Sequence, residues 1–309
     1  MPKITIIGAG FVGSTAAHWI AAKSLGDIVL LDIVEGAAIG KALDLSEALP
    51  IIRSTVTVRG TKDYKETKGS DVIVITAGIA RKPGMTRDDL LKINTKIVAD
   101  VAQQAIPHSP AAVVIVVSNP LDAMCYVTLK SSHHPRKKVI GMAGTLDTAR
   151  FHYFIAEKLN VPVTDVDAIV IGTHGDTMVP LPRHTKVKGR PLLEVMKKED
   201  IDEIIKRTIN GGAEIVNHLQ IGSAYFAPGA AIMQMVDAII NDTKKVLPCS
   251  VWLEGELGIK EVFLGVPVSL GCDGWEEVVD LRFNKEEMAA LEKAAAQVKE
   301  TIQSAESLL

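Results

Sequence analysis

Short runs of Val and Ile alternate with longer segments of mixed apolar and polar residues through the first half of the chain. Fully apolar runs of this length are typical of strands buried on both faces of a parallel sheet, and the segments between them are long enough for helices that cover the sheet. We therefore predict a doubly wound α/β domain with a parallel sheet. The predicted strands are residues 4–7, 28–31, 56–58, 72–75, 113–117 and 139–140, and the predicted helices are residues 14–23, 36–49, 87–104 and 121–131.

The pattern changes near Gly144, where strand-like runs become fewer and turn residues more frequent. This change predicts a Rossmann-type domain over residues 1–143 and an α+β substrate domain over residues 144–309, packed firmly because no flexible linker separates them. In the second domain, helices are predicted at residues 145–159, 201–220 and 227–240 and from residue 285 onward, and strands and turns at residues 166–188, 246–253 and 262–270.

Composition limits the class of protein. The chain has 309 residues, of which 47% are hydrophobic and 23% charged, and its formal net charge is -3. We expect no nucleic-acid partner because there is no basic field, and no membrane span because no apolar stretch reaches about 20 residues. The N-terminal residues lack the features of a signal peptide, so we expect a cytoplasmic location. Cys125, Cys249 and Cys272 lack metal-type spacing. We interpret them as reduced core thiols and expect no metal site.

A glycine-rich motif joins the first predicted strand to the first predicted helix. Gly8, Gly10 and Gly13 form G-x-G-x-x-G in that context, where the backbone can approach a pyrophosphate at the helix N-terminus. Asp32 ends the second predicted strand and can accept hydrogen bonds from ribose hydroxyls, which favours NAD over NADP because a 2′-phosphate would meet a like charge. A plain strand–helix turn, with Asp32 as a helix N-cap or turn residue before Glu35, fits the same residues.

Two arginines lie on a short loop that follows the apolar run 72–75. Arg81 and Arg87 are placed where ligands of open parallel sheets bind, beside the carboxyl end of a strand. Each guanidinium can bind a carboxylate through two parallel charge-assisted hydrogen bonds, so the loop predicts a site for a small dianion. A solvated basic loop is the alternative. Asn119, at the end of the fifth strand, can face a nicotinamide ribose or a substrate, but Asn before Pro120 is also common in turns.

Two further segments carry groups suited to proton transfer. Asp147 and Arg150 lie three residues apart in a predicted helix and so share one face. His174 follows the apolar run 168–171 and has glycines on both sides, two residues before it and one after it. A histidine held by a carboxylate is a general acid or base near neutral pH, and the guanidinium can reach a ligand. A hydrogen-bonded structural histidine is the alternative.

The order and spacing of these segments resemble the lactate/malate dehydrogenase family over almost the whole chain. The strings at residues 146–150, 172–176 and 223–228 resemble the lactate-dehydrogenase-like branch of the malate dehydrogenases. In this family the position of Arg81 is typically Arg where the substrate is malate and Gln where it is lactate. The resemblance therefore implies a dicarboxylate substrate, NAD as cofactor, and reversible oxidation of (S)-malate to oxaloacetate.

The same resemblance implies a role for each matched residue. It implies His174, Asp147 and Arg87 for catalysis, Arg81, Arg87, Asn119 and Arg150 for substrate binding, and Gly8, Gly10, Phe11, Val12, Gly13, Asp32, Asn94, Val117 and Asn119 for cofactor binding. It also implies that residues 79–89 close over the substrate, that the chain forms a homodimer or homotetramer, and that it serves the tricarboxylic acid cycle. Residues 16–22 and 36–49 are the interface candidates, although both also fit a buried role.

Three other functions are compatible with parts of this pattern. A lactate or other 2-hydroxy acid dehydrogenase would leave Arg81 in solvent. An NAD-dependent glycosidase on a related fold would need metal ligands including a Cys, whereas Ser118 precedes Asn119 here. A non-catalytic NAD-binding protein would not need the combination of Asp147, Arg150 and His174.

Overall fold

The computed structural model describes residues 1–80 and 84–309, so Arg81 lies outside the described residues. In the described part of the chain, eleven strands form one sheet. Its strands are β1 (Lys3–Ile7), β2 (Asp27–Leu31), β3 (Val58–Thr61), β4 (Val72–Ile75), β5 (Val113–Val116), β6 (Val139–Gly141), β8 (Val170–Gly172), β9 (Met178–Pro180), β12 (Lys245–Glu254), β13 (Lys260–Gly271) and β14 (Gly274–Val278).

The first six of these strands are parallel and lie in the order β3-β2-β1-β4-β5-β6. This is the doubly wound order of a Rossmann domain, and it confirms the predicted fold class. All four residues of β4 and of β5 are buried, as their uninterrupted apolar sequences require. The direction of winding reverses between β1 and β4, so the carboxyl ends of these two strands border the crevice where such sheets bind ligands.

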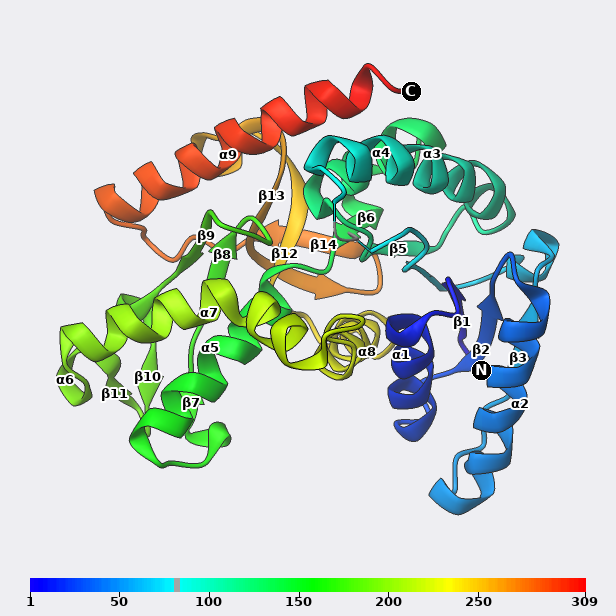
Figure 1. The fold of residues 1–309 in the computed structure, drawn as a ribbon, viewed down its shortest axis with the longest axis horizontal. Helices are drawn as coiled ribbons and strands as arrows, with labels where there is room; N and C mark the ends of the chain where they lie inside the picture. The colour runs from blue at the N-terminus through cyan, green and yellow to red at the C-terminus, as the bar shows by residue number, and fades with distance from the viewer. Residues whose placement is uncertain (81–83) are drawn as a thin grey trace.

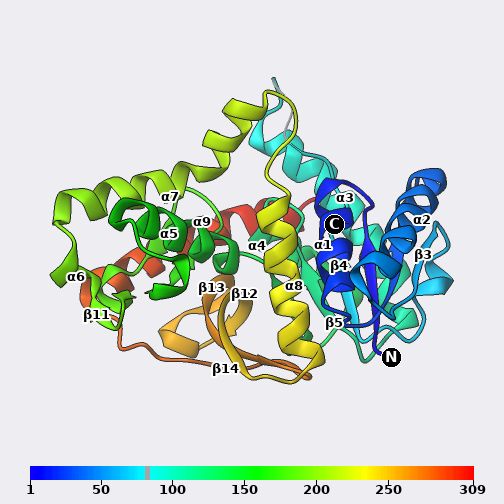
Figure 2. The same ribbon diagram turned by 90° about the horizontal axis from the view of Figure 1, so that it is seen from below.

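Helices cover both faces of this parallel sheet (Figure 1). On one side lie α1 (Phe11–Ala22) and α2 (Glu35–Ile52), and on the other lie α3 (Arg87–Ala105) and α4 (Leu121–Ser132). Figure 2 shows α8 (Phe226–Ile240) beside α1, and the two helices pack against each other. The interface candidate at residues 16–22 is therefore mostly internal, since Ala16, Ala17, Ile20 and Ala21 are fully buried.

The second half of the chain continues the same sheet with antiparallel strands. Strand β12 pairs with β6 and with β13, and β13 pairs with β8 and β14. The short strands β7 (Val166–Asp167), β10 (Lys186–Val187) and β11 (Arg190–Pro191) form a separate small sheet. The helices here are α5 (Gly144–Leu159), α6 (Leu192–Val195), α7 (Lys198–Leu219), α8 and α9 (Lys285–Glu306). One hydrophobic core runs from the parallel strands into β12 and β13. The division at residues 143 and 144 stays a prediction.

Two local predictions were wrong. The third strand begins at Val58, not at residue 56, because pairing with β2 starts opposite Ile28 and continues through Gly60. An apolar run does not mark this edge strand, and Gly60 is required there because a Cβ would lie 2.3 Å from the carbonyl oxygen of Ala38. Of the three thiols, Cys125 and Cys249 are buried as predicted, whereas Cys272 is exposed in the turn between β13 and β14. Within residues 1–80 and 84–309, no helix is long and apolar enough to cross a membrane.

Candidate active site

The glycine-rich loop between β1 and α1 is shaped by close packing. A Cβ on Gly13 would lie 2.0 Å from the carbonyl oxygen of Gly8, and a Cβ on Gly8 would lie 2.7 Å from Oγ1 of Thr76. A Cβ on Gly10 would point into open space. Gly10 is the N-cap of α1 and has no side chain with which to cap the helix, so the first N–H groups of α1 remain for an anion. The loop therefore fits the pyrophosphate of a dinucleotide.

Asp32 holds this loop in place from the end of β2. One carboxylate oxygen accepts a hydrogen bond from the Ala9 amide at 2.7 Å, and the other accepts one from the Val34 amide at 2.9 Å. Lys41 of α2 donates to the carbonyl oxygen of Ala9. Asp32 is not a helix N-cap, because α2 begins at Glu35 with Val34 as its N-cap. A carboxylate has about four lone-pair sites, so Asp32 retains acceptors for ribose hydroxyls.

Asn94 and Asn119 lie together where β4 and β5 end. The buried Asn94 amide accepts from the Ile79 amide at 2.9 Å and donates to the carbonyl oxygens of Ile79 and Asn119 at 3.1 and 2.6 Å. Asn94 is therefore bonded to the protein backbone and fixes the segment that carries Asn119. Of the other predicted cofactor residues, Val117 directly follows β5 and is half-buried, Val12 is half-buried, and Phe11 is exposed.

A buried carboxylate holds the predicted acid–base residue and one predicted arginine. Nδ1 of His174 lies 2.9 Å from Oδ2 of Asp147, and Nη1 of Arg150 donates to Oδ1 of Asp147 at 3.2 Å. Asp147 is fully buried, and the negative charge beside His174 raises the pKa of its imidazole. Because Nδ1 is engaged with Asp147, Nε2 is the ring nitrogen that can exchange a proton with a substrate. The structure thus brings these three predicted residues together.

Close packing at the start of α5 brings these groups together. Gly144 is the first residue of α5, and a Cβ there would lie 2.4 Å from the carbonyl oxygen of Val170 and 2.7 Å from the Pro248 side chain. The helix can therefore approach β8, whose next residues lead to His174. A side chain at position 144 could not be accommodated without a shift of α5, Val170 or Pro248.

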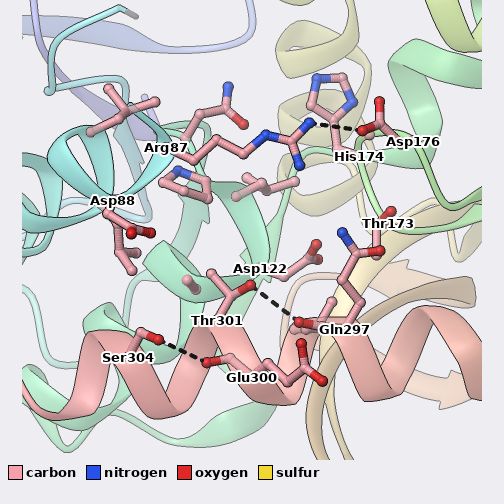
Figure 3. A pocket seen from close by; sticks show the side chains of 18 residues that line it. Arg87, Asp88, Asp122, Thr173, His174, Asp176, Gln297, Glu300, Thr301 and Ser304 are labelled. Carbon is pink, nitrogen blue, oxygen red and sulfur yellow. Dashed lines mark hydrogen bonds and ion pairs between the residues drawn. The ribbon is translucent and has the colours of Figure 1, made fainter. Parts of the chain in front are cut away.

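Arg87 reaches the same region from the opposite side. It is the first residue of α3, whose N-terminus is fixed by a capping box between Thr86 and Asp89. Nη2 of Arg87 forms an ion pair with Oδ2 of Asp176 at 2.8 Å, two residues after His174 (Figure 3). Both side chains are about 70% exposed, so this pair contributes little to stability and can open for a ligand.

A cleft of about 490 Å³ lies between these elements, and it contains several residues that sequence reasoning missed. Of the predicted catalytic and substrate-binding residues, His174, Arg87 and Asn119 line it, whereas Asp147 and Arg150 are not among its lining residues. Figure 3 shows that α9 forms one wall. The unpredicted polar lining residues are Asp88, Asp122, Thr173, Asp176, Gln297, Glu300, Thr301 and Ser304. Those on α9 could not be assigned from sequence, because the signal of a charged amphipathic helix is the same whether its polar side faces solvent or a cleft.

Asp122 is the most unusual of the missed residues. It is buried at the start of α4, and Oγ of Ser250 donates a hydrogen bond to its Oδ1 at 2.6 Å. Burial raises the pKa of Asp122 to about 6. The sequence signal for Asp122 is its position two residues after Pro120. This signal is weak, because carboxylates are common in the first turn of a helix. In the part of the chain that the structure describes, no group of three or more His, Cys, Asp or Glu residues could hold a metal ion.

Comparisons with known proteins cover nearly the whole chain. The family model of the lactate/malate dehydrogenase NAD binding domain matches residues 2–141, and that of the lactate/malate dehydrogenase alpha/beta C-terminal domain matches residues 144–309. The chain is 54% identical over 301 residues to a malate dehydrogenase from Roseiflexus sp. (strain RS-1), with 97% of each chain covered.

Two solved structures give the same picture. The apo malate dehydrogenase from Picrophilus torridus superposes with a TM-score of 0.96 at 44% identity, covering 99% of this chain and 98% of that one. The lactate dehydrogenase from Cryptosporidium parvum, complexed with lactic acid and NAD, superposes with a TM-score of 0.95 at 39% identity, covering 99% and 98%. The glycine-rich loop, the Asp147–His174–Arg150 group and these matches over nearly the full length show that the chain belongs to the lactate/malate dehydrogenase family.

Proposed function

We propose that this chain is an NAD-dependent malate dehydrogenase that interconverts (S)-malate and oxaloacetate. The observation that carries the proposal is that one buried carboxylate, Asp147, orients both a proton donor, His174, and a carboxylate-binding arginine, Arg150. A 2-hydroxy acid presents a hydroxyl and a carboxylate on adjacent carbons, which is the pair of groups that this arrangement can bind. Relatives named malate dehydrogenase, at about half identity over nearly the full length, support the dicarboxylate.

The chain fits NAD at the loop before α1. NAD, when bound, supplies the nicotinamide carbon that accepts a hydride from the substrate. The amides at the N-terminus of α1 would hold the pyrophosphate, and Asp32 the adenosine ribose. Asn119 and Val117 would face the nicotinamide side. Asn94 would act by holding the Asn119 backbone, in accordance with its hydrogen bonds. Phe11 and Val12 would border the dinucleotide at the start of the helix.

Each remaining residue acts on the substrate. In malate oxidation Nε2 of His174 takes the C2 hydroxyl proton, and in oxaloacetate reduction it returns one. Arg150 binds the C1 carboxylate through two charge-assisted hydrogen bonds, which fixes C2 for transfer. Arg87 leaves Asp176 and polarises the C2 oxygen as negative charge develops there. The side-chain amide of Asn119 donates a hydrogen bond to the substrate.

Arg81 is proposed to select the substrate by binding the distal C4 carboxylate. An Arg81→Gln variant is expected to lower the ratio of kcat/KM for oxaloacetate to kcat/KM for pyruvate by about 10- to 100-fold, because a charge-assisted hydrogen bond contributes about 1.5–3 kcal/mol. Steady-state NADH oxidation with each substrate measures this ratio. Arg190→Gln, an exposed arginine on β11, is the matched control and should leave it unchanged. An unchanged ratio in Arg81→Gln would show that Arg81 does not select the substrate.

The pKa of His174 predicts opposite pH dependences for the two directions. Asp147 raises this pKa, so the protonated form persists to higher pH than in a free imidazole. Oxaloacetate reduction requires the protonated ring and should fall as pH rises through the raised pKa, whereas malate oxidation should rise over the same interval. Asp147→Asn removes the largest cause of the shift and should move both midpoints to lower pH. We expect this in kcat/KM profiles from pH 5 to 10. Midpoints that stay in place would contradict the pairing.

The proposal also includes the oligomeric state and the cellular location. Ile39 and Leu43, one turn apart on α2, are about half exposed, which supports a homodimer or homotetramer in which residues 36–49 contact a second copy. We further propose a cytoplasmic location, as the N-terminal residues predict, and a place in the tricarboxylic acid cycle, as the family resemblance implies.

A further inference from the structure

Two adjacent glycines, Gly211 and Gly212, lie within α7, a continuous helix of 22 residues. Gly211 is buried and Gly212 half-buried. Glycine is the least favourable helix residue after proline, so a pair of glycines within a long helix usually has a packing or functional reason. The space around the two residues shows what that reason is.

Both glycines face the side chain of Arg150. A Cβ on Gly211 would lie 3.2 Å from Cδ and 3.6 Å from Nε of Arg150. A Cβ on Gly212 would lie 3.7 Å from Nη2 and 3.9 Å from Nη1 of the same side chain. The other near neighbour of Gly211 is the Phe154 ring, at 3.7 Å. The nearest atoms around both positions are therefore side-chain atoms, and the closest of them belong to Arg150.

Arg150 has little freedom to move away from α7. Its Nη1 is bonded to the buried Asp147, which is itself bonded to His174. Its Nε is buried and has no hydrogen-bond partner among the described residues. The guanidinium is thus anchored on one side by Asp147 and bounded on the other by the glycine surface of α7. A contact of 3.2 Å is tighter than ordinary van der Waals distance, so a methyl group at Gly211 would displace the stem of Arg150.

We propose that Gly211 is a positioning residue for substrate recognition, with Gly212 in a lesser role: together they set where Arg150 holds its guanidinium. This inference rests on the proposed function, which assigns the substrate carboxylate to Arg150. Gly211 touches neither substrate nor cofactor and acts only through Arg150. A displacement of a few tenths of an ångström in a bidentate pair weakens binding of the substrate and of the transition state alike.

The test compares Gly211→Ala with Gly212→Ala and with Lys206→Ala, a control at an exposed position of the same helix. For Gly211→Ala, KM for oxaloacetate should rise about 5- to 20-fold while kcat stays within about twofold, which is the signature of lost uniform binding. Gly212→Ala should raise KM by less than about threefold, and Lys206→Ala should not change it. The dissociation constant of NADH, measured by fluorescence, should match that of the unmodified chain, and the melting temperature of the glycine variants should not fall, because alanine is the better helix former.

A double-mutant cycle separates this role from a general packing effect. In an Arg150→Gln background, Gly211→Ala should no longer raise KM, because the guanidinium whose position it changes is gone. The inference is overturned if KM in Gly211→Ala is unchanged, if the increase persists without Arg150, or if the variant fails to fold. Absence of oxaloacetate turnover in the unmodified chain would instead refute the proposed function.

Discussion

Replacing His174 with asparagine is expected to lower kcat for oxaloacetate reduction by about 10²- to 10⁴-fold, the usual contribution of a positioned general acid or base. The imidazole is held at 2.9 Å by Asp147, and its Nε2 is the one proton donor that this grouping directs at a substrate. Asparagine can still bond to Asp147 but cannot release and regain a proton near neutral pH. The dissociation constant of NADH should change little, because the proposed role of His174 is toward the substrate and not the cofactor. Stopped-flow NADH oxidation measures the loss.

A matched histidine variant controls for nonspecific damage. His133 is exposed and ends α4 in a left-handed conformation that asparagine tolerates, so His133→Asn should retain full activity. If His174→Asn retained more than about a tenth of the unmodified rate, another group would be transferring the proton. Asp122, also in the cleft and with a pKa near 6, would then be the first residue to test.

The second large effect is expected at Arg150. Arg150→Gln should lower kcat/KM for oxaloacetate by about 10²- to 10⁴-fold, because two charge-assisted hydrogen bonds of about 1.5–3 kcal/mol each are lost. The same change leaves Asp147 without the positive charge that lies 3.2 Å from its Oδ1. Asp147 would still raise the pKa of His174, whereas the guanidinium of Arg150, which lowers this pKa, would be absent. The pH midpoint of the residual activity should therefore move upward. The measurement is the pH dependence of kcat/KM.

Arg150→Lys separates charge from geometry at this position. Lysine retains the positive charge but has no planar fork, so it should recover part of the affinity and not the bidentate orientation. We expect its kcat/KM to lie between those of Arg150→Gln and the unmodified chain. Equal values for the lysine variant and the unmodified chain would show that orientation by Arg150 is unimportant.

The parallel half of the fold was predictable because its strands are buried on both faces. Strands β1, β2, β4 and β5 are short, mostly apolar and almost entirely buried, which is the pattern of strands in a parallel sheet covered on both faces. The elements that were missed have weaker patterns. Strand β14 contains no apolar run and pairs only with β13, and β11 has two residues, too few for any periodicity. Strands β7 and β10 fall within the predicted stretch of strands and turns at residues 166–188.

The site was predictable where its chemistry is local in sequence. Asp147 and Arg150 share a helix face, and His174 follows a buried strand, so their types and spacing indicated their use. Residues brought in by distant pairing gave no such signal. Asp122 meets Ser250 across 128 positions because β12 pairs with β6, and Gly211 meets Arg150 because α7 packs on α5. The role of Arg81 stays a prediction, since that residue lies outside the described part of the chain.

The most direct test of the proposed function is NADH oxidation by the unmodified chain, followed in parallel with oxaloacetate and with pyruvate at matched concentrations, with His174→Asn as the blank. We predict a kcat/KM for oxaloacetate that exceeds that for pyruvate by at least about tenfold, and no comparable rate in the blank. A preference for pyruvate would contradict the assignment of oxaloacetate as substrate. Saturable NADH binding without turnover of either acid would contradict the claim that the chain is an enzyme.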